Sequence, residues 1–189
     1  MTPAVVIVSG LPRSGTSMMM AMLAAGGMPV LTDNLRRPDE HNPRGYLEFE
    51  AVKKTAIDPS WLAEAEGKAV KMVYLLLYDL PLDRPYKVVF MRRRLDEVLA
   101  SQESMLGTSD TRAVQVGQEQ LRARFAQHVS RVRTWLDQQL NFAVIDVDFQ
   151  EVLGNPQAVA TRLDKFLGPG LDLATMAGVP DQTLYRHRA

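Results

Sequence analysis

The chain has 189 residues, 46% of them hydrophobic, which predicts one well-buried domain spanning residues 1–189. Its 22 basic and 22 acidic side chains cancel, so bulk charge favours neither a nucleic-acid partner nor a membrane surface, and an anion site would have to be local. No apolar run approaches the roughly 20 residues that span a bilayer, and no secretory leader pattern is found, so we expect a cytoplasmic protein.

Cysteine is absent, which excludes disulfides, thiolate-bound zinc and thiol nucleophiles. The histidines, His41, His128 and His187, are far apart in the sequence, which argues against a histidine-based metal site. We therefore expect a function that needs no bound metal.

The first half of the chain predicts a strand, a helix and a long loop. Residues 4–9 are apolar and mostly β-branched and are closed by Gly10, as is typical of a strand buried on both faces of a parallel sheet. The methionine-rich run at 17–25 favours a helix. Three prolines, a glycine and mixed charges predict that residues 32–60 form an ordered loop with at most short helices.

A second buried strand is predicted at 86–91, followed by a helix over 95–106. Residues 116–140 predict a core-facing helix, because their apolar positions are spaced by fours and threes. These positions are Leu121, Phe125, Val129, Val132, Leu136 and Leu140.

Residues 142–147 predict a third strand, and Pro156, in a position that suits the first turn of a helix, opens a helix that runs to Leu167. Strands that alternate with helices predict an α/β fold, a single three-layer domain with a mainly parallel sheet. Ligands of such domains bind beyond the carboxyl ends of the strands.

Residues 10–17 have the outline of the nucleotide-binding P-loop, Gly-x4-Gly-Lys-Ser/Thr, between a predicted strand and helix. Thr16 stands where a nucleoside triphosphatase has its lysine, and the cation is at Arg13 instead. Backbone N–H groups and the helix N-terminus could still bind an anion. Arg13 with the hydroxyls of Thr16 and Ser17 suits a compact anionic group held without a metal; a glycine turn that binds nothing is the alternative.

Three adjacent arginines, Arg92, Arg93 and Arg94, precede the helix predicted over 95–106. Cations at a helix N-terminus are electrostatically unfavourable unless an anion binds there, which favours an anion site over a solvated helix start. Ser101 follows Arg93 by eight residues and would offer a hydroxyl two turns into the helix. The residues alone leave open which arginine binds.

These two segments resemble the signatures of the PAPS-dependent sulfotransferases, in particular the bacterial sulfotransferase-like proteins of the P-loop fold. The family's second signature, an arginine with a serine eight residues later that hold the 3′-phosphate, is matched by Arg93 and Ser101. The first signature surrounds the 5′-phosphosulfate and is matched at Pro12, Arg13, Ser14, Gly15, Thr16 and Ser17.

The resemblance implies transfer of a sulfuryl group from 3′-phosphoadenosine-5′-phosphosulfate (PAPS) to a hydroxyl or amine, with release of PAP. It covers most of the chain, because 146–156 and 166–168 resemble the family's late strand, turn and helix end. Phe149 and Gln150 stand where the family commonly has Tyr and Glu. The C-terminal segment 184–188 also resembles bacterial members, and its arginines would add charge near the nucleotide or form a solvated tail.

Sulfuryl transfer needs a positively charged group beside the leaving oxygen, for which Arg13 is the candidate. It also needs a base that takes the acceptor proton. Cytosolic aryl and steroid sulfotransferases take the base from a Lys-x-His segment. Aligning Lys71 with that lysine leaves Val73 in place of the histidine. Lys71 itself would position acceptor or sulfuryl oxygens, or is simply an exposed strand lysine.

Other branches of the family use a glutamate as base. Glu40, His41 and Glu48 lie in the loop after the first helix and are all candidates. The histidine is ready to accept a proton near neutral pH, whereas a glutamate would need burial to raise its pKa. The sequence does not choose among them.

Two other functions are compatible with the sequence. A metal-dependent nucleotide kinase would use the loop at 10–17 with Asp146 or Asp148 as its Mg²⁺ ligand. The loop of this chain, however, lacks the lysine that such a kinase needs. A non-catalytic module would bind PAP or PAPS and act through a partner. The acceptor, a small molecule or a glycan, and the oligomeric state cannot be read from the sequence.

Overall fold

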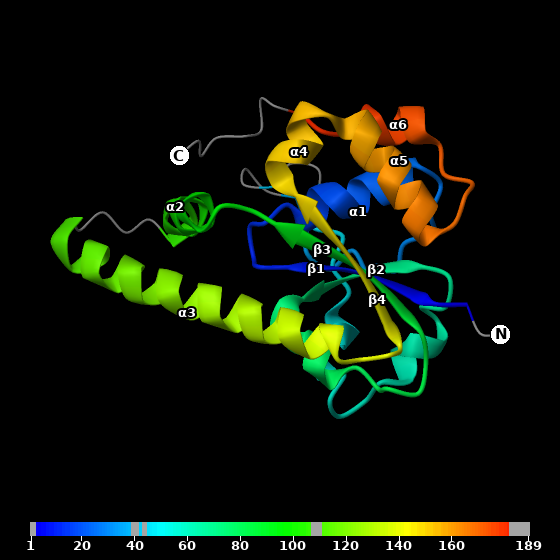
Figure 1. Ribbon diagram of the computed structural model, residues 1–189, viewed down its shortest axis with the longest axis horizontal. Helices are drawn as coiled ribbons and strands as arrows, with labels where there is room; N and C mark the ends of the chain where they lie inside the picture. Colours follow the sequence, from blue (N-terminus) through cyan, green and yellow to red (C-terminus); the bar gives the residue numbers. More distant parts are fainter. Residues whose placement is uncertain (1–2, 39–41, 43–44, 107–110, 182–189) are drawn as a thin grey trace.

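The computed structural model describes residues 3–38, 42, 45–106 and 111–181, and its centre is a parallel β-sheet (Figure 1). The strand order is β2-β1-β3-β4. The strands are β1 (Val5–Gly10), β2 (Ala69–Val73), β3 (Tyr86–Arg92) and β4 (Phe142–Asp148). The three predicted strands are confirmed, and β2 adds a fourth.

Helices cover both faces of the sheet, as Figure 1 shows. One face carries α1 (Thr16–Ala25), α4 (Phe149–Gly154), α5 (Pro156–Leu167) and α6 (Leu173–Ala177). The other carries α2 (Leu95–Leu106), α3 (Thr111–Asp137) and the 3₁₀ helices η1 (Glu50–Lys54), η2 (Ser60–Ala63) and η3 (Tyr74–Asp79). The predicted three-layer α/β fold with a parallel sheet is therefore confirmed.

The two layers explain why β1 is apolar throughout. Val5 and Ile7 point into the core under α3 and the 3₁₀ helices, while Val6 and Val8 point into the core under α1 and α5. All six residues of β1 are buried. Because side chains alternate along a strand, a strand covered on both faces needs apolar residues at every position.

The prediction for α3 is only partly correct. Val132 and Leu136 are buried against the sheet, whereas Leu121 is exposed and Leu140 lies beyond the helix end at Asp137 with its side chain fully in solvent. Figure 1 shows the N-terminal half of α3 beside α2, outside the area of the sheet. The apolar spacing predicted the helix correctly but not the point at which it leaves the core.

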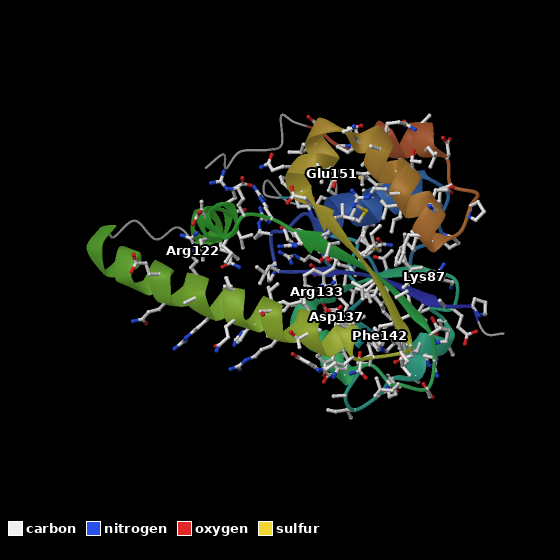
Figure 2. The ribbon with its side chains drawn as sticks, viewed as in Figure 1. Lys87, Arg122, Arg133, Asp137, Phe142 and Glu151 are labelled. Atoms are coloured by element: carbon white, nitrogen blue, oxygen red, sulfur yellow. The ribbon has the colours of Figure 1, made fainter. Side chains whose placement is uncertain are left out.

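Polar contacts join α3 to β4 and to α2, and α5 to β3 (Figure 2). Arg133 Nη2 of α3 lies 3.0 Å from Asp146 Oδ2 of β4, and Arg122 Nη1 lies 3.2 Å from Asp96 Oδ1 of α2. Lys87 Nζ of β3 donates hydrogen bonds to the last carbonyls of α5, those of Phe166 and Leu167. A lysine at this end of a helix satisfies carbonyls that have no partner within the helix.

The carboxyl ends of all four strands meet at one edge. Gly10 is in register with Val73 of β2 and Met91 of β3, and Arg92 is in register with Asp148 of β4. The loop between β1 and α1, the start of α2 and the start of α4 therefore emerge side by side. This is the edge at which parallel sheets bind their ligands.

Candidate functional site

The loop between β1 and α1 has an unusual backbone. Gly10 and Gly15 have positive φ values of 148° and 96°, and Arg13, which is not a glycine, has φ 72°. A Cβ atom on Gly10 would lie 2.6 Å from Met91 O and from Ser14 Oγ, so only glycine fits against β3 here. A left-handed Arg13 costs energy, and the cost is offset only if surrounding contacts hold it in place.

Two buried hydroxyls adjoin this loop. Ser9 and Ser14 are at most 1% exposed, and neither Oγ atom has a hydrogen-bond partner among the described residues. Buried hydroxyls without partners are unfavourable, so a ligand that accepts their hydrogen bonds would stabilise them. The Ser14 hydroxyl lies within the predicted phosphate loop; Pro12 is exposed at its tip, and Thr16 begins α1.

The residues of the two sequence signatures are in direct contact. Arg13 Nε donates a hydrogen bond of 2.8 Å to Ser101 Oγ, and Arg93 Nη1 donates one of 3.0 Å to the carbonyl of Arg13. These bonds hold Arg13 at both its backbone and its guanidinium. They link the loop to α2, although 88 residues separate Arg13 from Ser101. The predicted 5′ and 3′ phosphate sites are thus neighbours.

Arg93 is the least exposed of the three adjacent arginines, and it contacts the loop. The side chain of Arg93 is 8% exposed, whereas Arg92 and Arg94 are exposed to solvent. Arg93 Nε also pairs with Glu97 Oε2 at 2.8 Å, and its guanidinium lies 4.2 Å from the centre of the Phe149 ring. The choice of Arg93 over its neighbours is consistent with this geometry, while its binding of phosphate stays a prediction.

Phe149 connects α4 to the loop. A Cβ on Gly15 would lie 2.6 Å from Phe149 Cδ2, so the ring occupies the space that a side chain at position 15 would need. Asp148 caps α4 by accepting hydrogen bonds from the backbone N–H groups of Gln150 and Glu151, which fixes where Phe149 starts.

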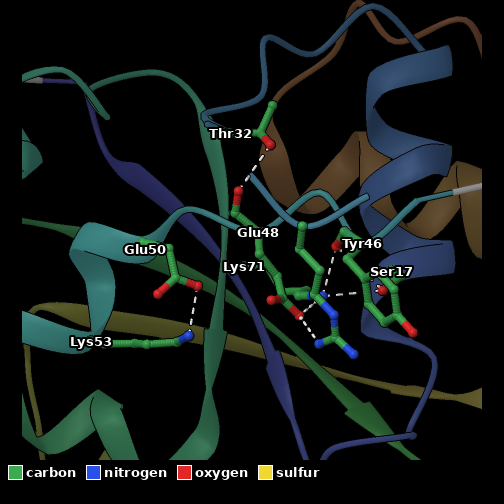
Figure 3. A network of polar contacts seen from close by, with 8 residues as sticks. Ser17, Thr32, Tyr46, Glu48, Glu50, Lys53 and Lys71 are labelled. Atoms are coloured by element: carbon green, nitrogen blue, oxygen red, sulfur yellow. Dashed lines mark hydrogen bonds and ion pairs between the residues drawn. The ribbon is translucent and has the colours of Figure 1, made fainter. Parts of the chain in front are cut away.

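A second polar group lies beside the loop, around Lys71 (Figure 3). Lys71 Nζ donates to Ser17 Oγ at 3.1 Å and to the Tyr46 carbonyl at 2.6 Å, and it pairs with Glu48 Oε1 at 3.0 Å. The side chain of Lys71 is only 11% exposed. The interpretation of Lys71 as an exposed strand lysine is therefore wrong.

The charge of Lys71 is set by opposing effects. Burial lowers the pKa of Lys71, and its hydrogen bond and ion pair with Glu48 raise the pKa by a smaller amount. Arg36 and Arg13 add positive charge nearby, which also lowers the pKa. Lysines with a lowered pKa are frequent in functional sites, because such sites combine burial with nearby charges.

Glu48 is anchored by the loop from which it comes. Its carbonyl accepts hydrogen bonds from Thr32 Oγ1 and Asp33 N, and its carboxylate pairs with Arg36 as well as with Lys71. The Arg36 guanidinium lies 3.4 Å from the centre of the Tyr46 ring. Glu48 and Lys71 are thus brought together, while the other two base candidates, Glu40 and His41, lie outside the described residues, as does 184–188.

The carboxylates that a nucleotide kinase would use have other partners. Asp148 caps α4, and Asp146 pairs with Arg133. In the ranges that the structure describes, no three His, Asp or Glu side chains gather to form a metal site. None of the described helices is both long and apolar enough to cross a membrane.

Sequence reasoning missed two partners in this site. Gln150 Nε2 donates to Glu97 Oε1 at 2.8 Å, and the carbonyl of Tyr46 accepts from Lys71. The ion pair of Arg93 with Glu97 was also missed, although its spacing of four residues at a helix start is a sequence signal that could have revealed it. The Tyr46 contact has no sequence signal, because it involves a backbone carbonyl in a loop.

No protein-family model matches the chain, and no curated protein is similar to it in sequence. Among solved structures, a sulfotransferase domain from the curacin biosynthetic pathway is similar over 97% of this chain and 76% of that chain. The two sequences are 14% identical and the TM-score is 0.47. This similarity is too distant to assign an activity.

Proposed function

We propose that the chain is a PAPS-dependent sulfotransferase that moves a sulfuryl group to a hydroxyl or amine of a small-molecule or glycan acceptor. The observation that supports this most is the contact of Arg13 with Ser101 and of Arg93 with the Arg13 carbonyl. PAPS carries anionic groups on the 5′ and 3′ oxygens of one ribose. Its recognition therefore requires two neighbouring cationic sites, and arginines from two separate segments would supply them.

In this reaction the acceptor oxygen or nitrogen forms a bond to sulfur while the bond from sulfur to the bridging phosphate oxygen breaks. The electron pair of that bond stays on the oxygen, which leaves as part of PAP, and the acceptor proton passes to a base. Arg13 would stabilise the leaving oxygen, and Lys71, in contact with Ser17 in the first turn of α1, would stabilise the sulfuryl oxygens.

Among the described residues, Glu48 is the candidate for the base, because it lies 3.0 Å from Lys71 on the loop side of the site. When the acceptor proton reaches Glu48, the positive charge of Lys71 becomes available to the oxygens around the sulfur, including the bridging oxygen, whose negative charge increases as it leaves with PAP. The pair would act as a unit in which each partner compensates the charge change of the other.

Calorimetric titration tests the proposal at the donor level. The protein should bind PAP without added metal and more tightly than Mg·ATP, and Arg93→Ala should weaken PAP binding by about 30-fold or more, as expected for the loss of a charge-assisted contact. Arg124→Ala, an exposed arginine of α3, is the matched control and should bind as wild type does. Tighter binding of Mg·ATP than of PAP would refute the proposal.

A screen with radiolabelled PAPS and a panel of alcohols, phenols, amines and sugars tests the transfer step. Label should appear on at least one class of acceptor. If PAP binds but label is never transferred from PAPS, the chain is a binding module and the catalytic part of the proposal is wrong.

A further inference from the structure

The strand-end arginine is held by a carboxylate that is almost completely buried. The Glu97 side chain is 1% exposed, and both of its oxygens accept hydrogen bonds. Oε2 accepts from Arg93 Nε and Oε1 accepts from Gln150 Nε2, each at 2.8 Å. A buried carboxylate is tolerated only when it is paired and its lone pairs are satisfied. Arg93 supplies the charge, and Gln150 supplies the second donor.

Residues from three segments of the chain thereby fix the plane of the Arg93 guanidinium. Glu97 of α2, itself held by Gln150 of α4, accepts from Nε, and the carbonyl of Arg13 in the loop accepts from Nη1. The Phe149 ring of α4 packs against the face of the guanidinium. A free arginine side chain has many rotamers, and binding an anion normally requires that most of them be lost. An arginine held in this way loses little further freedom when an anion binds.

The partner at position 150 matters because it is an amide. An amide donates to Glu97 without adding charge, so Glu97 and Arg93 remain a neutral pair. A carboxylate at the same position would repel Glu97, and an apolar side chain would leave Glu97 Oε1 without this donor. Gln150 is itself exposed, so it supports the site through its hydrogen bond to Glu97 and not by packing in the core.

We infer that Glu97, supported by Gln150, is a positioning residue that orients Arg93 and so makes the site prefer a nucleotide with a 3′-phosphate over the same nucleotide without one. This inference rests on the proposed function, because it takes Arg93 to be the ligand of the 3′-phosphate. The preference is a ratio of two affinities, which a general loss of structure would not selectively change.

The experiment measures dissociation constants for PAP and for AMP, which lacks the 3′-phosphate, in wild type and variants. Gln150→Leu should weaken PAP binding about three- to tenfold and leave AMP binding unchanged, as expected for one lost hydrogen bond to a charged group. Gln157→Leu, an exposed glutamine at the start of α5, is the matched control and should leave both affinities unchanged.

A second variant, Glu97→Gln, keeps the size of the side chain and removes its charge. It should weaken PAP binding about tenfold or more with AMP binding retained, and circular dichroism verifies that it is folded. If Glu97 only neutralised Arg93, removal of its charge would tighten PAP binding, and that result would overturn the inference.

The positioning role of Glu97 and the proposed function can be refuted separately. If wild type prefers PAP to AMP and Gln150→Leu retains the full preference, Glu97 does not position Arg93, while the proposed function stands. If wild type binds PAP and AMP equally, Arg93 does not bind a 3′-phosphate, and the proposed function fails together with the inference.

Discussion

The two sides of the site are built differently. On the proposed donor side, Arg93 directly follows the end of β3, Glu97 and Ser101 belong to α2, and their side chains are almost fully buried. On the acceptor side, Glu48 comes from the loop at 32–60 and is 21% exposed, and its partner Arg36 is 42% exposed. We therefore expect the donor-side contacts to contribute to folding as well as to the proposed binding, and changes to the acceptor-side charges to leave the fold intact.

The largest effect is expected where the two sides meet, at Arg13. Arg13→Ala should lower the rate of sulfuryl transfer about 100- to 1,000-fold, because it removes the positive guanidinium that would stabilise the negative leaving oxygen. Single-turnover transfer to an acceptor identified in the PAPS screen measures this rate. Arg13→Lys should recover part of the rate, because it restores charge without the planar guanidinium. If Arg13→Ala transfers at the wild-type rate, the donor side is not the place where the leaving group is stabilised.

Stability should separate the two sides. Glu97→Ala leaves Arg93 buried without its carboxylate and should lower the free energy of unfolding by about 3 kcal/mol. Glu48→Ala removes a partly solvated partner and should lower it by less than about 1 kcal/mol. Urea denaturation of both variants measures the difference. Equal losses would show that the loop carrying Glu48 is as much a part of the folded core as α2.

The smallest effect concerns the pH dependence contributed by Lys71. Because burial lowers the pKa of Lys71, the folded protein releases this proton at a lower pH than the unfolded chain, whose lysines titrate near about 10.4. Between these two pKa values the unfolded chain binds more protons, so the free energy of unfolding contributed by Lys71 rises with pH.

Wild type should therefore become more stable relative to Lys71→Met as the pH is raised from neutral towards about 10. Urea denaturation of both proteins at each pH measures this change. Lys68→Met, which replaces a partly buried lysine just before β2, is the control. A gap that closes or reverses as the pH rises would mean that the Glu48 contacts outweigh burial in setting the pKa of Lys71.

The sequence predicted the parts of the molecule in which local pattern and tertiary environment agree. The runs around Val6 and Val89 are apolar because both faces of the sheet are covered, and helix α2 was located to the residue. The helix at 116–140 was less well predicted, because apolar spacing does not show where a helix leaves the core. Leu140, at the end of the spacing pattern, is in solvent.

The grouping of Arg13, Arg93 and Ser101 was also predictable, since they belong to motifs with fixed spacing. The acceptor side was not, because its contacts depend on how a long loop folds back onto β2. The contact between Lys71 and the Tyr46 carbonyl is an example. Strand β2 carries Lys71 between apolar neighbours, a mixed pattern that did not predict a strand clearly.

The contact of Phe149 with Gly15 has a consequence for protein engineering. The ring fills the space above the loop glycine, and the same ring packs against the Arg93 guanidinium. A phosphate loop transplanted from another protein would fit beneath this ring if it keeps glycine at position 15. In a library, position 15 should therefore stay glycine while position 149 is varied, because a φ of 96° disfavours any side chain there whatever residue packs above it.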